Sequence, residues 1–369
     1  MIKILNFIQC LNLGGMEQSA YSLIESTQGQ TVDWTVQSVT PVGEGLDKLT
    51  KFQVPVKGSP YIGRFGWRSH ALLKKEVDSF DGDIILITGP TLTSCAAVKR
   101  HRAKKVLGVH FVHGQRQQDI AKWKTFYKLF GSDYDAFIYH SQHIFDEAVS
   151  IAPSLAHKFR LINYATTRCS IPNAQEKEAS RKLLGIPKGH RVIGNAGWLI
   201  QRKRFDVFLK TCQRIKERYS KVKFLIAGDG NLRSELESLA LSLGIFEDVI
   251  FLGWQQSLDN FYKSLDILLF NSDSDAFGRT VMEAMGYGVP SVASVVEGGP
   301  KSILIDGENG FMTTAHDVEM LSQNCLLLLE DENRYWQFQS KAIATIKNQC
   351  SHEKYIENYL SVFREVLTK

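Results

Sequence analysis

Asp83-Ile84-Ile85-Leu86-Ile87-Thr88, which leads into Gly89-Pro90, is the stretch that decides the fold class. It has the length of a strand, and its central residues are all aliphatic, so both of its faces would be buried. Strands buried on both faces are typical of parallel sheets, because each connection between parallel strands crosses a face of the sheet and covers it. The stretch therefore predicts an α/β protein with a parallel sheet.

Similar apolar runs recur along the chain and alternate with helical patterns. In the first half they are Ile2–Ile8, Val32–Val39, Val106–Val109 and Ala136–Tyr139. In the second half they are Val192–Gly194, Lys223–Ala227, Val249–Leu252, Ile267–Phe270 and Ser291–Ala293. Helical periodicity covers Met16–Ile24, Phe205–Tyr219, Leu232–Leu243, Gly278–Tyr287 and Lys354–Val366. The alternation predicts two Rossmann-like doubly wound domains that face each other across a cleft.

A polar, proline-containing stretch at 168–189 separates the two halves and predicts a linker with one short helix. We expect one domain over 1–167, a second over 168–350, and a C-terminal helix within 351–369 that packs back on the first domain. The six cysteines are scattered without a C-x-x-C pair, which fits a reducing compartment. Since no apolar run reaches the length of about 18 residues needed for a membrane span, we expect a cytoplasmic protein.

The net charge of +5 is unevenly distributed. Residues 1–165 carry 19 Lys and Arg against 14 Asp and Glu, whereas residues 166–369 carry 25 of each. Within the first half, the stretch 99–128 has nine basic residues and one acid, Asp119. This excess predicts an anionic partner for the first half, either a membrane surface or a phosphorylated ligand.

Three motifs fall where strands end and helices begin. Gly14-Gly15-Met16-Glu17 follows the first strand, where glycines let the backbone approach an anion at a helix N-terminus. Gly197 to Asp206 places the cations Arg202, Lys203 and Arg204 where a helix starts; cations are disfavoured there, so an anion is expected to bind. The blander interpretations are an ordinary turn and a solvated charge run.

The third motif, 271–285, contains a loop acid, Asp275, and a helix acid, Glu283. Carboxylates accept paired hydrogen bonds from sugar hydroxyls, so both acids are candidates for one ligand. For an isolated acid pair, a solvated loop and a surface helix residue would be the simpler interpretation.

Taken together, these motifs resemble those of the retaining glycosyltransferases of family 4, which have the GT-B fold. Asp275 and Glu283 stand as the family's E-x7-E pair, with seven residues between them. Further landmarks match at Ala276-Phe277-Gly278, Glu283-Ala284-Met285, Gly288-Val289-Pro290, Gly228-Asp229-Gly230, Phe251-Leu252-Gly253, Asp306-Gly307-Glu308-Asn309-Gly310 and Gly14-Gly15-Met16-Glu17. The resemblance covers nearly the whole chain and is strongest over 190–312.

The resemblance implies a role for each matching residue. Glu283 would hold the ribose hydroxyls of a nucleotide, and Asp275, with the backbone of Phe277 and Gly278, would hold the donor sugar. Lys203 would bind the diphosphate, helped by N–H groups near Gly15 and Thr280. The other implied binding residues are Gly14, Arg202, Arg204, Gly228, Leu252 and Trp254, of which Leu252 and Trp254 line the base pocket. No metal and no cofactor beyond the donor is expected.

The chain departs from the family pattern at three positions. Trp198 stands where the family usually has an arginine, and Arg202 or Arg204 is expected to supply the missing cation. Asp275 replaces a glutamate, and Arg204 replaces a glycine. The family's histidine near the transferred sugar corresponds to His110, which directly ends a strand, or to His113; both are catalytic candidates with Lys203 and Asp275, and His110 is favoured.

The implied reaction moves a sugar, with retention, from a nucleoside diphosphate sugar to a glycan or a polyprenyl-diphosphate-linked glycan, in bacterial surface polysaccharide synthesis. A non-catalytic nucleotide-sugar-binding protein and a GT-B sugar epimerase are the alternatives, and nucleic acid is not an expected partner. The acceptor would bind the basic first half. There, one helical face carries Ile120, Trp123, Phe126, Tyr127 and Phe130, which either packs on the sheet or contacts the inner face of the membrane.

Overall fold

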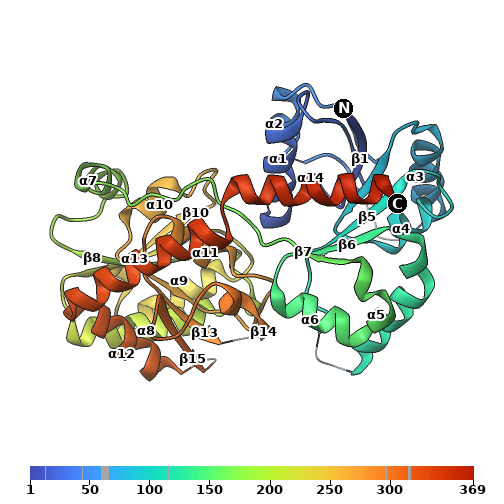
Figure 1. Cartoon of the computed structure of the whole chain (residues 1–369). Helices are drawn as coiled ribbons and strands as arrows, with labels where there is room; N and C mark the ends of the chain where they lie inside the picture. The colour runs from blue at the N-terminus through green and yellow to red at the C-terminus, as the bar shows by residue number, and fades with distance from the viewer. Residues whose placement is uncertain (13, 44, 60–65, 115–116, 296, 315–316) are drawn as a thin grey trace. The chain divides into compact units, whose positions relative to one another are not determined.

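The computed structural model describes residues 1–12, 14–43, 45–59, 66–114, 117–295, 297–314 and 317–369. The chain forms two units: Met1–Tyr164 together with Glu353–Lys369, and Ala165–His352. Each unit contains a parallel sheet with helices between its strands (Figure 1). The sequence-based boundaries fell after residues 167 and 350, and those of the structure fall after Tyr164 and His352.

The first unit has a seven-stranded sheet in the order β3-β2-β1-β4-β5-β6-β7. Its strands are β1 (Ile2–Ile8), β2 (Val32–Ser38), β3 (Val56–Lys57), β4 (Ile84–Thr88), β5 (Lys104–Val109), β6 (Ala136–Tyr139) and β7 (Phe159–Leu161). Its helices are α1 (Gly15–Thr27), α2 (Leu46–Lys51), α3 (Trp67–Ser79), α4 (Leu92–Ala97), α5 (Gln117–Phe130) and α6 (Gln142–Ile151). The aliphatic run that predicted a parallel strand is β4, and all five of its residues are buried.

The last helix, α14 (His352–Thr368, red in Figure 1), packs within this first unit although it ends the chain. The Tyr355 hydroxyl donates to the Ser19 carbonyl of α1 at 3.3 Å, and the Phe363 ring meets the buried Trp34 ring at 6.1 Å. Glu365 forms an ion pair with Arg160 of β7. Helix α14 therefore contacts α1 and strands β2 and β7 of the first unit.

The second unit has a six-stranded sheet in the order β10-β9-β8-β11-β13-β15 and a short parallel pair, β12-β14. Its strands are β8 (Arg191–Ala196), β9 (Val222–Ala227), β10 (Val249–Gly253), β11 (Ile267–Phe270), β12 (Ser274–Asp275), β13 (Ser291–Val295), β14 (Glu297–Gly298) and β15 (Gly310–Thr314). Its helices are α7 (Ala174–Leu183), α8 (Phe205–Arg218), α9 (Arg233–Ser242), α10 (Asp259–Ser264), α11 (Arg279–Gly286), α12 (Val318–Glu330) and α13 (Glu332–Gln349). A continuous core joins the apolar faces of α8 and α12 to the sheet.

Each strand expected from the sequence is present, and these two parallel sheets with their helices confirm the predicted fold class. Strands β3, β12 and β14, which have two residues each, and strands β7 and β15 were not predicted. β7 has three residues with Arg160 at its centre, and β15 begins at Gly310 and ends in two threonines, so neither forms an apolar run.

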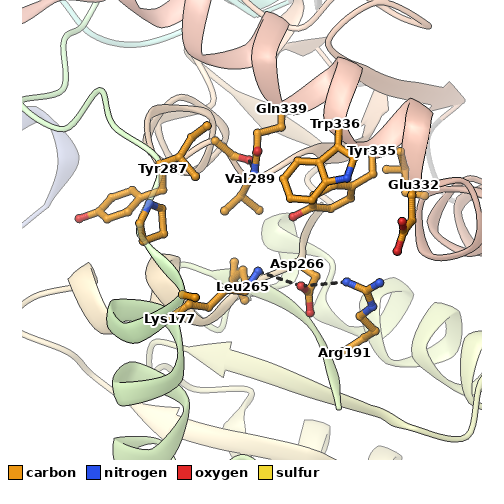
Figure 2. Close-up of a pocket in the computed structure, with 15 residues that line it drawn as sticks. Lys177, Arg191, Leu265, Asp266, Tyr287, Val289, Glu332, Tyr335, Trp336 and Gln339 are labelled. Carbon is orange, nitrogen blue, oxygen red and sulfur yellow. Dashed lines mark hydrogen bonds and ion pairs between the residues drawn. The ribbon is translucent and has the colours of Figure 1, made fainter. Parts of the chain in front are cut away.

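A pocket of about 260 Å³ lies at the amino ends of β8 and β11 (Figure 2). Its polar groups are paired with one another. The buried Asp266 carboxylate contacts Lys177 at 2.8 Å and Arg191 at 3.5 Å, and the Gln339 amide donates to the Gly288 carbonyl at 3.0 Å. Because these groups already satisfy each other, this edge of the sheet is a structural anchor rather than an open recognition site.

Asp266 holds the linker helix α7 to the sheet. Besides Lys177, it accepts hydrogen bonds from Arg181 at 2.6 Å and from the Val192 N–H at 2.7 Å. Burial opposes ionisation of this carboxyl, but Lys177 and Arg181 outweigh burial, so its pKa lies below its usual value. The carboxylate is therefore charged and fully compensated at neutral pH.

Replacing Asp266 with asparagine should destabilise the protein by about 3–5 kcal/mol at pH 7, since it leaves buried cations without their counter-charge. The depressed pKa means that the ionic contribution is present above about pH 4 and is lost as the pH falls through the lower folded-state pKa. Chemical denaturation of Asp266→Asn and wild type should thus show a difference that shrinks below pH 4. Asp119→Asn, which removes an exposed pair with Lys122, should change stability by about 1 kcal/mol or less.

Candidate functional site

The strand order of the second unit creates a switch point between β8 and β11. From β8 the chain proceeds outward to β9 and β10, then returns to β11 on the other side of β8 and continues to β13 and β15. In open α/β sheets, ligands bind beyond the carboxyl ends of the two strands at such a point. The segments that follow these strands are 197–204 and 271–278, which carry two of the three sequence motifs.

Hydrogen bonds hold these two segments side by side. The Asp273 N–H donates to the Arg202 carbonyl at 2.8 Å, and the Ser272 hydroxyl donates to the same carbonyl at 3.3 Å. The Arg202 guanidinium donates in return to the Ser274 carbonyl. All three bonds end on backbone carbonyls, and one of them is donated by a backbone N–H.

Lys203 and Asp275 meet at the centre of this switch point. The Lys203 Nζ lies 2.5 Å from Asp275 Oδ2 and 5.6 Å from the centroid of the Phe270 ring. Asp275 Oδ1 accepts from the N–H groups of Phe277 at 3.1 Å and Gly278 at 2.8 Å. The structure thus brings together residues 72 positions apart that the motifs predicted separately.

Burial raises the energy of the ionised Asp275 carboxyl, but Lys203 and the two backbone N–H groups outweigh it. The pKa of Asp275 is therefore lowered from its usual value. The side chains of both residues keep some exposure, 13% for Lys203 and 16% for Asp275, so the pair is held in place without being sealed from solvent.

Glu283, the second motif acid, projects from α11 and is fixed through both of its oxygens. The Tyr262 hydroxyl donates to Oε2 at 2.8 Å, and the Arg279 guanidinium donates to Oε1 at 3.0 Å. Tyr262 is itself stacked on Tyr287, with ring centroids 5.3 Å apart. Burial and the nearby Glu283 raise the pKa of Tyr262, so its hydroxyl keeps the proton that it donates.

The start of α11 is shaped by Gly278, which has φ of +80°. A Cβ there would also lie about 3.0–3.2 Å from Pro300, so both the backbone angle and the neighbouring chain require glycine. The next turn is tied to β8 by the Thr280 hydroxyl, which donates to the Ala196 carbonyl at 3.2 Å. The N-terminus of α11 is thereby directed at the switch point.

The backbone of Arg204 has a conformation that favours glycine. Its backbone is left-handed, with φ 48° and ψ 43°, just before α8. Its guanidinium makes a two-pronged contact with Asp206, at 2.9 and 3.0 Å, and reaches Asp273 at 3.3 Å. Arg204 therefore joins the two loops, as does the exposed Arg202 side chain through its bond to Ser274.

Trp198 does not replace the family's arginine with another cation. Its ring packs against Trp254, which follows β10, with centroids 4.7 Å apart and 37° between the planes. Both rings keep large exposed areas, 48% for Trp198 and 38% for Trp254. This part of the second unit thus has an exposed aromatic surface, and the role of Leu252 and Trp254 in a base pocket stays a prediction.

The close packing of the backbone requires a glycine at position 228. A Cβ at this position would lie 1.9 Å from the Gly197 carbonyl oxygen, and φ is +140°. The Gly197 N–H donates to Ala227 and the Gly228 N–H to Gly253, at 2.9 and 2.8 Å. Three neighbouring strand ends are thus packed backbone to backbone.

In the first unit, Gly14 and Gly15 begin α1, as the motif predicted. Glu17 folds back over this end: a Cβ at position 14 would lie 2.5 Å from its Oε2. The other Glu17 oxygen accepts from the Cys10 thiol at 3.1 Å, and burial together with this contact raises the pKa of Cys10 to about 12. The motif's own carboxylate therefore lies at the helix N-terminus where an anion was expected.

The two candidate histidines have different surroundings. His110 follows β5 and its Nδ1 lies 2.5 Å from the Tyr164 hydroxyl. His113 is 2% exposed, with Nδ1 at 3.1 Å from Glu147 and Nε2 at 2.9 Å from the Tyr127 hydroxyl. Both ring nitrogens of His113 are thus engaged by neighbouring side chains, which fits a packing role, and the catalytic role of His110 stays a prediction.

The aromatic face of α5 packs on its own sheet. Tyr127 contacts Phe137 and Phe159, with ring centroids 5.7 and 5.9 Å apart, and Trp123 meets His113 at 4.5 Å. Lys122, Lys124 and Lys128 are exposed on the rest of the helix, together with Leu129. The basic stretch continues through 115–116, which lie outside the described residues.

Sequence reasoning missed several residues that the fold adds to these sites. Tyr262 and Arg279 reach Glu283, and His140 lies beside His110. Asn271 is buried at the end of β11, and neither its amide oxygen nor its nitrogen has a hydrogen-bond partner among the described residues. The sequence held a signal for three of them: His140 and Asn271 directly follow apolar strands, and Arg279 stands four residues before Glu283 on one helix.

Over the described parts of the chain, no group of three or more His, Cys, Asp or Glu side chains is placed to hold a metal ion. Within the same residues, no helix combines the length and the apolar character needed to cross a bilayer.

Comparison with known proteins identifies relatives of the second unit. Residues 176–345, which contain Lys203, Asp275 and Glu283, match the family model "Glycosyl transferases group 1". The lipopolysaccharide core biosynthesis glycosyltransferase LpsE of Rhizobium meliloti is 28% identical over 182 residues, 49% of this chain and 52% of that protein. The N-acetyl-alpha-D-glucosaminyl L-malate synthase of Bacillus anthracis is 27% identical over 51% of this chain and 49% of that protein. The chain thus spans about half the length of these curated relatives.

The fold of the whole chain also has solved counterparts. Anabaena HepE, crystallised with UDP and glucose, superimposes with a TM-score of 0.85 over 99% of this chain and 100% of that one, at 19% sequence identity. The likeness establishes the GT-B fold.

Two substitutions at Arg204 distinguish the effect of its backbone conformation on stability from the effect of its guanidinium contacts. Arg204→Gly and Arg204→Ala both remove the guanidinium. Only alanine has an unfavourable conformational energy in the left-handed region, so the glycine variant should be more stable by about 1–2 kcal/mol. Lys210, an exposed residue inside α8, provides the control: there glycine should be less stable than alanine by about 1 kcal/mol. Thermal or denaturant unfolding measures both pairs, and the same order at both sites would contradict the interpretation.

Proposed function

We propose that the protein, whose residues 176–345 match the model of the glycosyl transferases group 1, transfers a sugar from a nucleoside diphosphate sugar to an acceptor hydroxyl, with retention at the anomeric carbon. The proposed acceptor is a glycan or a polyprenyl-diphosphate-linked glycan, and the proposed setting is bacterial surface polysaccharide synthesis. The relative LpsE, named for lipopolysaccharide core biosynthesis, supports this setting.

The observation that carries the proposal is the meeting of Lys203, Asp275 and the N-terminus of α11 at the switch point of the second sheet. Transfer separates charge, because the sugar becomes cationic as the diphosphate departs with extra negative charge. A lysine ammonium and a helix N-terminus are both suited to stabilise that anion. Lys203 has three N–H donors, so it can keep Asp275 and still bind a phosphate oxygen.

Neighbouring groups are proposed to bind the remaining parts of the donor. The Asp275 carboxylate, kept ionised by Lys203, is suited to accept hydroxyls of the sugar, and Glu283, oriented by Tyr262, is suited to accept the ribose hydroxyls. The Trp198 and Trp254 rings would pack against the base. HepE, which was crystallised with UDP and glucose, supports a nucleotide sugar as the donor. His110 is proposed to orient the transferred sugar.

The decisive experiment incubates the protein with UDP-glucose, UDP-N-acetylglucosamine, UDP-galactose and GDP-mannose, and measures binding by calorimetry and release of nucleoside diphosphate. At least one donor should bind; Glu283→Gln should weaken its binding by about tenfold or more, and Lys203→Ala should lower the release rate by about 10²-fold. Glu330→Gln and Lys188→Ala, which change exposed residues elsewhere on the unit, should leave both unchanged. The proposal fails if no nucleotide sugar binds, or if Glu283→Gln leaves binding and Lys203→Ala leaves the release rate unchanged.

The same assay tests the stereochemistry and the proposed independence from metal. NMR of the product should show the anomeric configuration of the donor. The rate should be unaffected by EDTA, because Lys203 and the α11 N-terminus are proposed to balance the departing charge. Inversion, or activity lost with EDTA and restored by a divalent cation, would contradict these parts of the proposal.

We also propose that the basic face of α5 contacts anionic lipid from the cytoplasmic side, near the acceptor. With the aromatic face packed on the sheet, the attraction would come from Lys122, Lys124 and Lys128, at about 1 kcal/mol each. Changing all three to glutamine should lower flotation with phosphatidylglycerol vesicles by about 10²-fold at low salt. The matched variant Lys182→Gln, Lys188→Gln, Lys347→Gln has the same net charge but should float like wild type. Equal flotation of the two variants would overturn the proposal.

A further inference from the structure

Four aromatic side chains, His110, His140, Tyr164 and Tyr359, lie together at the carboxyl ends of β5, β6 and β7. His110 and His140 are stacked with ring centroids 4.3 Å apart and 24° between the planes. His140 is stacked in turn on Tyr164, at 4.4 Å and 19°. Tyr359 of α14 continues the stack at 6.3 Å and 21°. The rings of His110 and Tyr164 are themselves 5.9 Å apart, so His140 stacks on both of them without separating them.

The pairing of the strands produces this arrangement. Val109 and Tyr139 are opposite each other in the parallel register of β5 and β6, so the residues that follow them, His110 and His140, leave the sheet side by side. Tyr164 follows β7, the next strand of the sheet. The stack belongs entirely to the first unit.

His140 has a defined protonation at one nitrogen. Its Nδ1 lies 2.8 Å from the Ile162 carbonyl, and a carbonyl can only accept, so Nδ1 carries a proton. Its Nε2 lies 3.4 Å from the Tyr359 hydroxyl. His140 is completely buried, so this ring cannot reorient without breaking the contact with Ile162. It gives His110 a fixed surface to stack on.

Tyr164 determines which nitrogen of the His110 ring carries the proton. The Tyr164 hydroxyl lies 2.5 Å from His110 Nδ1. A phenol is the stronger acid of the two neutral groups, so it is suited to donate to an unprotonated ring nitrogen. The tautomer with the proton on Nε2 then follows, because one ring nitrogen of a neutral imidazole donates when the other accepts.

Gly108 supplies the room that this ring position needs. A Cβ at position 108 would lie 2.9 Å from His110 Nε2. The atom it would meet is the far end of a side chain, so an alanine at this position displaces the His110 ring rather than the strand. Three independent features, a stack, a hydrogen bond and a missing side chain, thus specify one ring position.

We propose that Tyr164 and His140 are positioning residues that hold the His110 ring in one orientation with its proton on Nε2. The orientation is a property of the first unit alone, and its use in sugar transfer rests on the proposed function. Neither residue touches the reacting atoms in this scheme; both act through His110.

The orientation is tested without any substrate. In protein labelled with ¹⁵N at histidine, the His110 ring should show an unprotonated Nδ1 and a protonated Nε2 near pH 8, with the resonance identified by its loss in His110→Gln. Tyr164→Phe should convert this pattern to a mixture of tautomers, whereas Tyr134→Phe, a change at another buried tyrosine that packs on Phe137, should not. A proton on Nδ1 in wild type, or an unchanged pattern in Tyr164→Phe, overturns the proposal whether or not the enzyme is active.

The consequence for transfer is tested with the donor identified above. Tyr164→Phe should lower kcat by about tenfold while the donor KM changes by less than about twofold, because binding groups in the second unit are untouched. His140→Ala should lower kcat similarly, and His140→Phe, which keeps a flat ring in the stack, should restore most of it. Gly108→Ala should lower kcat with both Tyr164 and His140 in place.

A purely structural role would lower the melting temperature of these variants but leave the kcat of the folded fraction at the wild-type value. That result would overturn the positioning role. If no donor is turned over by wild type, the proposed function fails, and the ¹⁵N measurement still decides the orientation of His110.

Discussion

The parallel pairing of β8 with β11 is the constraint on which the second unit depends. Parallel strands bring like ends together, so whatever precedes the two strands meets at one edge of the sheet and whatever follows them meets at the other. At the amino edge, Asp266 is joined by the linker helix and by the first residues of β8. At the carboxyl edge, the Lys203 and Asp275 loops meet. One pairing thus builds both the anchor and the candidate site.

The two ion pairs at these edges differ in a way that separates structure from function. The Asp266 carboxylate is 3% exposed and is surrounded by three cations and a backbone N–H, so its capacity to accept is used up. Asp275 has one lysine and two N–H groups, and it keeps solvent access. A site that must exchange its partners when a ligand arrives cannot be saturated in the way the Asp266 anchor is.

Much of the fold was predictable because it is encoded locally. Strands such as Ile84–Thr88 are apolar on both faces, and the switch-point motifs sit where strand patterns give way to helical ones. The combination of Lys203, Asp275 and Glu283 was also predictable, since each stands in a short motif. What sequence could not supply were contacts between distant segments: Tyr262 with Glu283, Trp198 with Trp254, or Tyr164 and His140 with His110. The left-handed backbone of Arg204 could not be predicted either. A glycine such as Gly278 suggests a positive φ, whereas an arginine does not.

Helix α14 gives the first unit an unusual order of assembly. The second unit is inserted between residue 164 and residue 353, so a ribosome completes the whole of it before releasing the 17-residue helix that covers Trp34 and bonds to α1. Until then, the first sheet has an apolar surface with no permanent cover, while the second unit has everything it needs to fold. The first unit, which contains the residues synthesised first, is therefore expected to complete its folding after the second unit.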